Sequence, residues 1–372
     1  MSGQGQRPGK HYDQFHHLIY GDEHGFKISV IGSECKTFGK RLSFSRMESR
    51  EVIVVGGGIA GLSAAIYLAR AQRDTLVIDS AHSMAKWEPK VENYLGFPKG
   101  VDGRDLLKNG RKQAEHYGAE FVTDTINQVA MDQEAFSLRG ENGIYRAQRL
   151  LLATGIYHIP PEIPGVRECL GHSLFFCKDC DGYRVRGKKI AIIGANNDAV
   201  EYALGMLYYS PCVIVATNGD KIAWDKQHAK WLEEYEIPVE TGRIRDLRHR
   251  KEKIQALIYD SEREVKIDYL FTTRGDIFHT ELAENLGAKL DGDGQVEVDQ
   301  CMRTSVPRLY AAGCVTPANC QIVIAAGQGA AAAQAINRDL FNESLANHQL
   351  RRFRNEQLET TETVPEGASG PA

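Results

Sequence analysis

The sequence lacks several features that would point to particular classes of protein. No apolar run is long enough to cross a bilayer, for which about 20 consecutive apolar residues are needed. The formal net charge of -4 argues against nucleic-acid binding through bulk electrostatics. The 8 cysteines among 372 residues are too scattered for a disulfide-stapled secreted domain. We therefore expect a cytoplasmic protein that binds neither nucleic acid nor a membrane.

The two ends of the chain differ in composition from the part between them. Residues 1–46 carry Gly, His and charge without helical or strand period, and they lack the apolar stretch of a secretory signal. We expect this segment to be either a disordered arm or an upstream extension. Residues 344–372 become polar and rich in Pro and Gly, which predicts a solvated tail.

The middle of the chain contains two strand–turn–helix–strand patterns. In the first, Val52–Val55 is a buried strand, Ile59–Ala71 has helical spacing, and a second strand ends at Asp79. A similar pattern covers 189–216. Two such units predict an α/β protein with two Rossmann-like, three-layer domains. Prolines at the crossing and a late strand and helix predict that the second domain, 162–277, is inserted into a first domain formed by 47–161 and 278–343.

The first glycine-rich turn has the spacing of a dinucleotide-binding loop. Gly56, Gly58 and Gly61 follow a strand and precede a helix, and Asp79 ends the next strand 18 positions after Gly61. The helix N-terminus supplies free amide donors for a diphosphate, and the acid can accept hydrogen bonds from ribose hydroxyls. In this context the motif predicts a bound dinucleotide.

One close cysteine pair, Cys177 and Cys180, could clip a metal, staple a loop or pass electrons. Structural zinc needs four ligands, and the sequence has no second C-x-x-C, so we expect no metal site. A disulfide across so short a loop stabilises little. A redox role fits better: Lys178 would favour a thiolate, and Asp181 could move the proton that thiol–disulfide exchange requires.

From about Met47 to Leu340 the sequence resembles the low-molecular-weight thioredoxin reductases and their flavoprotein relatives. The matching stretches are GGGIAGLSAAIYLAR, VENYLGFPKGVDG, LLLATG, CKDCDG, DAVEYA and VPRLYAAGCV followed by QIVIAAGQG. The resemblance implies FAD in the first domain, an NAD(P)-binding-like second domain that carries the cysteine pair, a homodimer, and a rotation between domains. By resemblance, the residues along the cofactor are Asn93, Gly96, Thr154, Gly155, Gly313 and Gln321.

The same resemblance assigns the redox roles. Cys180 would contact the flavin, Cys177 would attack the disulfide of the partner, and Asp181 would be the acid and base. Our leading hypothesis is a disulfide reductase that acts on thioredoxin or a similar dithiol protein. Two alternatives are another FAD- and NAD(P)-dependent oxidoreductase, such as a ferredoxin-NADP reductase-like enzyme or an oxidase, and a redox-sensing binding module.

The chain departs from the family pattern at two places. Cys314 replaces a usual Asp, and Cys320 stands where an Arg is common; we expect both to be small buried packing residues.

In the second glycine loop, Asn196 occupies the second glycine position, and the next strand ends in Thr-Asn-Gly-Asp (217–220) where NADPH users place a His-Arg-Arg cluster. These replacements make NADPH a doubtful donor. Weak NADH binding, no dinucleotide with reduced ferredoxin as donor, and some other donor remain open, and we favour ferredoxin.

Overall fold

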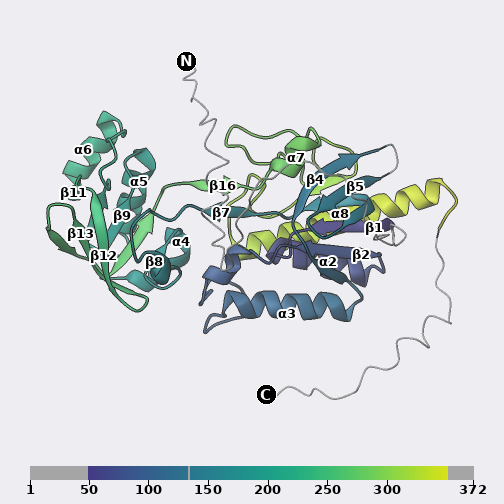
Figure 1. Cartoon of the computed structure of the whole chain (residues 1–372), viewed down its shortest axis with the longest axis horizontal. Coiled ribbons are helices and arrows are strands. Elements are labelled where there is room, and N and C mark those ends of the chain that lie inside the picture. The colour runs from purple at the N-terminus through teal and green to yellow at the C-terminus, as the bar shows by residue number, and fades with distance from the viewer. Residues whose placement is uncertain (1–48, 133–134, 351–372) are drawn as a thin grey trace, which may run out of the picture. The chain divides into compact units, whose positions relative to one another are not determined.

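The computed structural model describes residues 49–132 and 135–350 (Figure 1). The predictions for residues 1–46 lie outside the described residues, as do those for the tail beyond residue 350. None of the described helices combines the length and apolarity that spanning a bilayer would require.

The first sheet has seven strands in the order β3-β2-β1-β6-β5-β4, with β17 beside β6. Strands β1, β2, β3, β6 and β17 run parallel, whereas β4 and β5 form an antiparallel extension next to β6. The central strands are apolar along their length because helices and loops cover both faces of a parallel sheet. The bounds are β1 (Ser49–Val55), β2 (Thr75–Asp79), β3 (Glu120–Thr123), β4 (Ile126–Met131), β5 (Phe136–Gly140), β6 (Ile144–Leu152) and β17 (Leu309–Ala311).

Small residues allow two helices of this part of the chain to approach closely. Helix α2 (Ile59–Arg70) packs on α8 (Ile322–Ala346), and a Cβ atom added at Gly329 would lie 2.1 Å from the Ala60 carbonyl oxygen. Helix α3 (Gly103–His116) lies beside α2 (Figure 1). The shorter elements here are η1 (Met84–Trp87) and α7 (Glu281–Asn285).

The second sheet has five parallel strands in the order β11-β10-β9-β15-β8. A three-stranded antiparallel sheet, β12-β13-β14, follows in the same stretch of chain. The strands are β8 (Leu174–Phe175), β9 (Ile190–Ile193), β10 (Val213–Ala216), β11 (Val239–Glu240), β12 (Ile244–Arg250), β13 (Lys253–Tyr259), β14 (Glu264–Lys266) and β15 (Tyr269–Thr272). The helices are η2 (Arg167–Cys169), α4 (Lys178–Asp181), η3 (Gly182–Val185), α5 (Asn197–Met206) and α6 (Lys226–Glu234).

The chain passes between the two sheets twice, and the two passages pair with each other. Strand β7 (Ile156–His158) runs antiparallel to β16 (Asp276–Phe278), as Figure 1 shows. The α/β fold with two Rossmann-like units is confirmed. Helix α8 continues to Ala346, past the predicted start of the tail at residue 344, because no Gly or Pro follows Gly329 before His348 adopts a left-handed φ of 57°.

Two glycines in α8 give a matched test of the close contact with α2. We expect Gly329→Ala to lower the free energy of unfolding by about 1–3 kcal/mol, because its Cβ would collide with the Ala60 carbonyl. A Cβ at Gly327 meets nothing within 4 Å, so Gly327→Ala should raise stability by about 0.5–1 kcal/mol. Urea unfolding followed by circular dichroism measures both; shifts of the same sign in the two variants would contradict this packing.

Candidate functional site

The predicted cysteine pair is joined as a disulfide at the start of a short helix. Cys177 and Cys180 have their Cα atoms 5.3 Å apart, and both side chains are half-buried. Cys177 is the N-cap of α4, and its Sγ accepts a hydrogen bond from the Cys180 backbone N–H at 3.1 Å. A donor aimed at this sulfur favours its thiolate once the disulfide is reduced.

Residues distant in sequence meet at this disulfide. Gln321 is the N-cap of α8, and its Nε2 lies 3.3 Å from Cys180 Sγ and 3.4 Å from Cys177 Sγ. Its Oε1 accepts a hydrogen bond from Asn93 Nδ2 at 2.9 Å. The structure therefore brings four of the predicted site residues into one cluster.

Asp181 is a buried carboxyl next to the cysteine pair. It is 2% exposed and forms an ion pair with Arg184 at 3.1 Å. Burial raises the pKa of Asp181 to about 6, although the guanidinium of Arg184 opposes the shift. Burial and the charge of Asp181 raise the pKa of Glu88 as well. A carboxyl that is partly protonated near neutral pH is suited to proton transfer.

Lys178, predicted to favour the thiolate, has other partners. Its Nζ lies 3.6 Å from Asp179 Oδ1 and 5.8 Å from the centre of the Tyr202 ring. The positive polarity at Cys177 therefore comes from the backbone N–H of Cys180 rather than from an ion pair with the neighbouring lysine.

The first glycine loop has the geometry of a diphosphate cradle. Gly56 has a left-handed φ of 109°, and a Cβ there would lie 2.2 Å from the Ala153 carbonyl oxygen. A Cβ at Gly61 would lie 1.9 Å from the Gly56 carbonyl oxygen, so that only glycine fits. A Cβ at Gly58 would meet only Ser83 Oγ, at 3.5 Å, and no side chain in the described part of the chain caps the start of α2. The first-turn amides of α2 thus remain available to an anion.

Asp79 is placed as the loop requires. One carboxylate oxygen accepts the Gly57 N–H at 3.0 Å, which fixes the side chain at the end of β2. The other oxygen can accept from ribose hydroxyls. Gly57, which sequence reasoning passed over, is needed because a Cβ there would lie 2.6 Å from Asp79 Cγ. The run of three glycines was the signal for it.

Gly313 belongs to the same loop region, whereas Thr154 and Gly155 do not contact the cysteine pair. A Cβ at Gly313 would lie 3.0 Å from the Ala60 Cβ, at the start of α2. Its N–H donates to Gln328 Oε1 at 2.8 Å. Thr154 Oγ1 donates to the His279 carbonyl at 2.6 Å, and Gly155 accepts from the His279 N–H at 3.1 Å, so this pair of residues lies where the chain crosses between sheets.

The prediction for Cys314 and Cys320 is wrong. The two residues form a second disulfide, with Cα atoms 4.9 Å apart; Cys314 is half-buried and Cys320 is exposed. The chain folds back between them through backbone hydrogen bonds from Thr316 N–H to the Gly313 carbonyl and from Ala318 N–H to the Thr316 carbonyl. Turns of this kind bring residues six positions apart together, and the spacing alone carries no recognised motif.

A side chain of the second glycine loop caps the helix that follows the loop. Asn196 is the N-cap of α5, and its Oδ1 accepts the Ala199 N–H at 3.3 Å. Asp220 forms an ion pair with Arg274 at 3.4 Å, and Asn218 Oδ1 accepts the Ile244 N–H at 2.8 Å. The Asn196 side chain thus occupies a donor that a dinucleotide diphosphate would use, and a carboxylate lies in the turn after β10.

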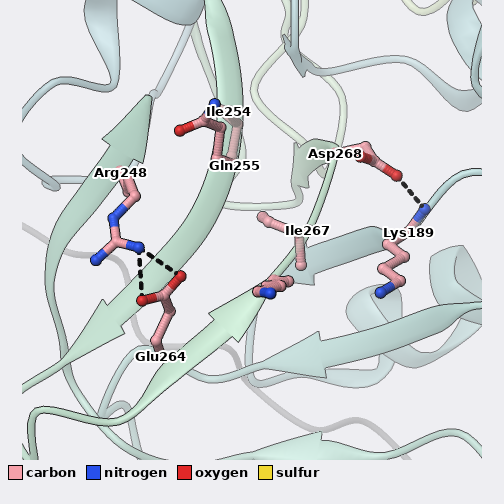
Figure 2. A pocket seen from close by; sticks show the side chains of 8 residues that line it. Lys189, Arg248, Ile254, Gln255, Glu264, Ile267 and Asp268 are labelled. Carbon is pink, nitrogen blue, oxygen red and sulfur yellow. Dashed lines mark hydrogen bonds and ion pairs between the residues drawn. The ribbon is translucent and has the colours of Figure 1, made fainter. Parts of the chain in front are cut away.

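Among the described residues, neither the pocket on the second half of the chain nor its acidic and sulfur side chains form a further site. Figure 2 shows an open pocket of about 370 Å³ that shares no residue with the cluster above and whose Arg248 and Glu264 pair with each other. Within residues 49–132 and 135–350, no group of three or more His, Cys, Asp or Glu side chains could hold a metal ion.

Comparisons with known proteins agree on one family. The family model described as pyridine nucleotide-disulphide oxidoreductase matches residues 50–333. A thioredoxin reductase of Treponema pallidum (strain Nichols) is 32% identical over 77% of this chain and 95% of its own length. A thioredoxin reductase of Bacillus subtilis (strain 168) is 29% identical over 77% and 93%. The crystal structure of HlmI aligns with a TM-score of 0.77 at 29% identity, over 82% of this chain and 96% of that one.

The hydrogen bond from Cys180 N–H to Cys177 Sγ leads to a labelling prediction. After full reduction, we expect Cys177 to react with iodoacetamide at neutral pH at least several-fold faster than Cys180, because its thiolate is the stabilised one. Trypsin separates them into peptides 168–178 and 179–184, and fragmentation distinguishes Cys177 from Cys169 in the first, so mass spectrometry reads each rate. The exposed Cys212 serves as the internal reference. Equal rates, or a faster Cys180, would contradict the expected polarity.

Proposed function

Because the chain belongs to the pyridine nucleotide-disulphide oxidoreductase family, within the low-molecular-weight thioredoxin reductases, we propose that it reduces the disulfide of thioredoxin or a similar dithiol protein. It is an FAD-dependent disulfide reductase in which electrons pass through Cys177 and Cys180. The single observation that carries the proposal is the disulfide of these two residues, held against the Gln321 side chain at the start of α8.

The residues of the first domain fit FAD at its dinucleotide end. Gly56, Gly58 and Gly61 would hold the diphosphate over the N-terminus of α2, and Asp79 would bind the ribose. Asn93, Thr154, Gly155, Gly313 and Gln321 would line the flavin half. When bound, the flavin supplies two reducing equivalents to a neighbouring disulfide.

The thiol chemistry follows from the two sulfurs. Once the pair is reduced, the Cys177 thiolate attacks a sulfur of the partner's disulfide and forms a mixed disulfide. Cys180 then attacks Cys177, which releases the partner as a dithiol and restores the Cys177–Cys180 bond. Cys177 suits the first role because its Sγ already accepts a backbone N–H.

Asp181 is the acid and base of this exchange. Its raised pKa, about 6, leaves a fraction protonated near neutral pH, so that it can give a proton to a leaving thiolate and take one back. Arg184, 3.1 Å away, opposes the effect of burial and lowers the pKa of Asp181, so that the carboxyl can also give up its proton during the exchange.

For the electron donor we propose reduced ferredoxin rather than NADPH. The second glycine loop caps its own helix with Asn196, and Asp220 would repel a 2′-phosphate at the end of β10. On this proposal the domain of residues 162–277 is a scaffold that carries the cysteine pair. We also propose that the domains have the bounds given above, that the protein is a homodimer and that it is cytoplasmic. The family resemblance supports these three points.

The rival functions differ from this one in their use of the cysteines. A ferredoxin-NADP reductase-like enzyme or an oxidase would turn over without Cys177 and Cys180. A redox-sensing binding module would change its disulfide state but would not reduce thioredoxin catalytically. Turnover with thioredoxin, measured with and without the pair, therefore separates all three.

Cys177 and Cys180 together form the thiol relay from the flavin to the partner. Replacing either of them should abolish turnover and leave flavin binding unchanged. We expect Cys180→Ser and Cys177→Ser each to lower thioredoxin-dependent insulin reduction at least about 10³-fold, since an intermediate of the thiol exchange is lost. The flavin absorbance of the purified protein should stay unchanged. The matched control is Cys212→Ser, an exposed free cysteine, which should keep full activity. Intact partner reduction in Cys180→Ser would disprove the relay.

A donor screen tests the hypothesis that reduced ferredoxin, and not a nicotinamide dinucleotide, supplies the electrons. The yellow protein is mixed anaerobically with NADPH, NADH or reduced ferredoxin while the visible flavin band is followed. We expect ferredoxin to bleach the band at least ten times faster than either nucleotide, because Asn196 occupies a helix-end amide that a diphosphate would use and Asp220 would also repel the 2′-phosphate of NADPH. Dithionite serves as the control for a reducible flavin. Rapid bleaching by NADPH would refute the ferredoxin proposal without touching the thiol relay.

A further inference from the structure

The second disulfide, Cys314–Cys320, has no part in the relay described above, and its two halves lie in different surroundings. The Cys314 side is fixed: Val315 and Thr316 are buried, and Gln295 Nε2 donates to the carbonyls of Cys314 at 3.3 Å and Thr316 at 2.8 Å. The other side, with Cys320, is exposed. One sulfur is thus anchored while the other can be reached by a nucleophile.

This bond lies next to the first redox pair. Cys320 is linked by a peptide bond to Gln321, and the Gln321 amide contacts the sulfurs of both Cys177 and Cys180. The Gln321 side chain and one peptide unit thus connect Cys320 to the sulfurs of the first pair. Exposed disulfides are also the labile ones in proteins, whereas structural ones resist thiol attack.

We propose that Cys314–Cys320 is a second redox-active disulfide, which the reduced Cys177/Cys180 pair reduces by thiol–disulfide exchange. The inference rests on the proposed function, which supplies the reduced pair. Nothing in the family comparison requires a disulfide at this loop.

The exchange balances within the chain. The Cys177 thiolate attacks Cys320 Sγ, the Cys314–Cys320 bond breaks, and Cys314 leaves as a thiolate that takes up a proton. Cys180 loses its proton and attacks Cys177 Sγ, which releases Cys320 as a thiolate that takes up the second proton. Two electrons and two protons have then moved: Cys177–Cys180 is oxidised to the disulfide and Cys314/Cys320 is reduced to the dithiol.

The first experiment counts thiols in the intact flavoprotein. Dithionite is added anaerobically in steps, each sample is quenched with N-ethylmaleimide, and tryptic peptides are weighed. Peptide 309–338 holds both Cys314 and Cys320. Peptide 179–184 reports Cys180, and 168–178 reports Cys177 once fragmentation separates its label from that of Cys169. In the wild type we expect 309–338 to gain two labels. In Cys177→Ser/Cys180→Ser its labelling should be at least ten-fold slower.

The outcomes separate the two proposals. If peptides 168–178 and 179–184 stay unlabelled at Cys177 and Cys180, the proposed function fails. If those two label and 309–338 remains a disulfide, the second bond is structural and the further inference is overturned. Equal labelling of 309–338 with and without the first pair would also overturn it, because electrons would then bypass that pair.

A trapping variant gives an independent measurement. In Cys180→Ser/Cys314→Ser, neither resolving thiol remains, so mild oxidation with diamide should join Cys177 to Cys320 as peptide 168–178 linked to 309–338. Cys180→Ser/Cys212→Ser is the matched control, in which Cys314 can still resolve the bond and the linked peptide should not accumulate. Failure to form the link in a folded, yellow double variant would overturn the proposal.

Discussion

The return of the chain to its first sheet is the constraint on which the site depends. After the second sheet is complete, β17 pairs in parallel with β6, so the segment that follows must start where β1 and β6 also end. Gly313 then meets the start of α2, and α8 begins at Gln321 beside the cysteine pair. Strand pairing thus places one segment of the chain, residues 313–321, against the diphosphate cradle at one end and the redox sulfurs at the other.

The features that the sequence predicted correctly are those that depend on residues close together in the chain. The buried strands, the turn glycines Gly56 and Gly61, and Asp79 at a strand end follow from spacing alone, and the structure has them in place. The Cys177–Cys180 pairing was likewise readable from a three-residue step. Gln321 was found only through the resemblance, because its contact with the sulfurs comes from tertiary packing.

What the sequence could not provide are partners fixed by the path of the chain. The Cys314–Cys320 bond depends on two consecutive turns after Gly313, and the sequence reading treated the two cysteines as separate. The ion pair that moderates Asp181 needs Arg184 one helical turn on, in a segment too short to show periodicity. Lys178 was misjudged for the opposite reason, since adjacency in sequence did not make it a partner of the sulfur.

Arg184 also connects the buried carboxyl of Asp181 with the segment of residues 88–92. It donates to the Lys90 carbonyl and pairs with Glu92, while Asp181 and Glu88 repel each other across the same contact. Separation of residues 178–185 from 88–92 would hydrate Asp181 and remove that repulsion, so the pKa of Asp181 would fall and a proton would leave. Because the contact holds the pKa of Asp181 near 6, above its ordinary range, protonation of this carboxyl at acidic pH favours the contact between the two segments.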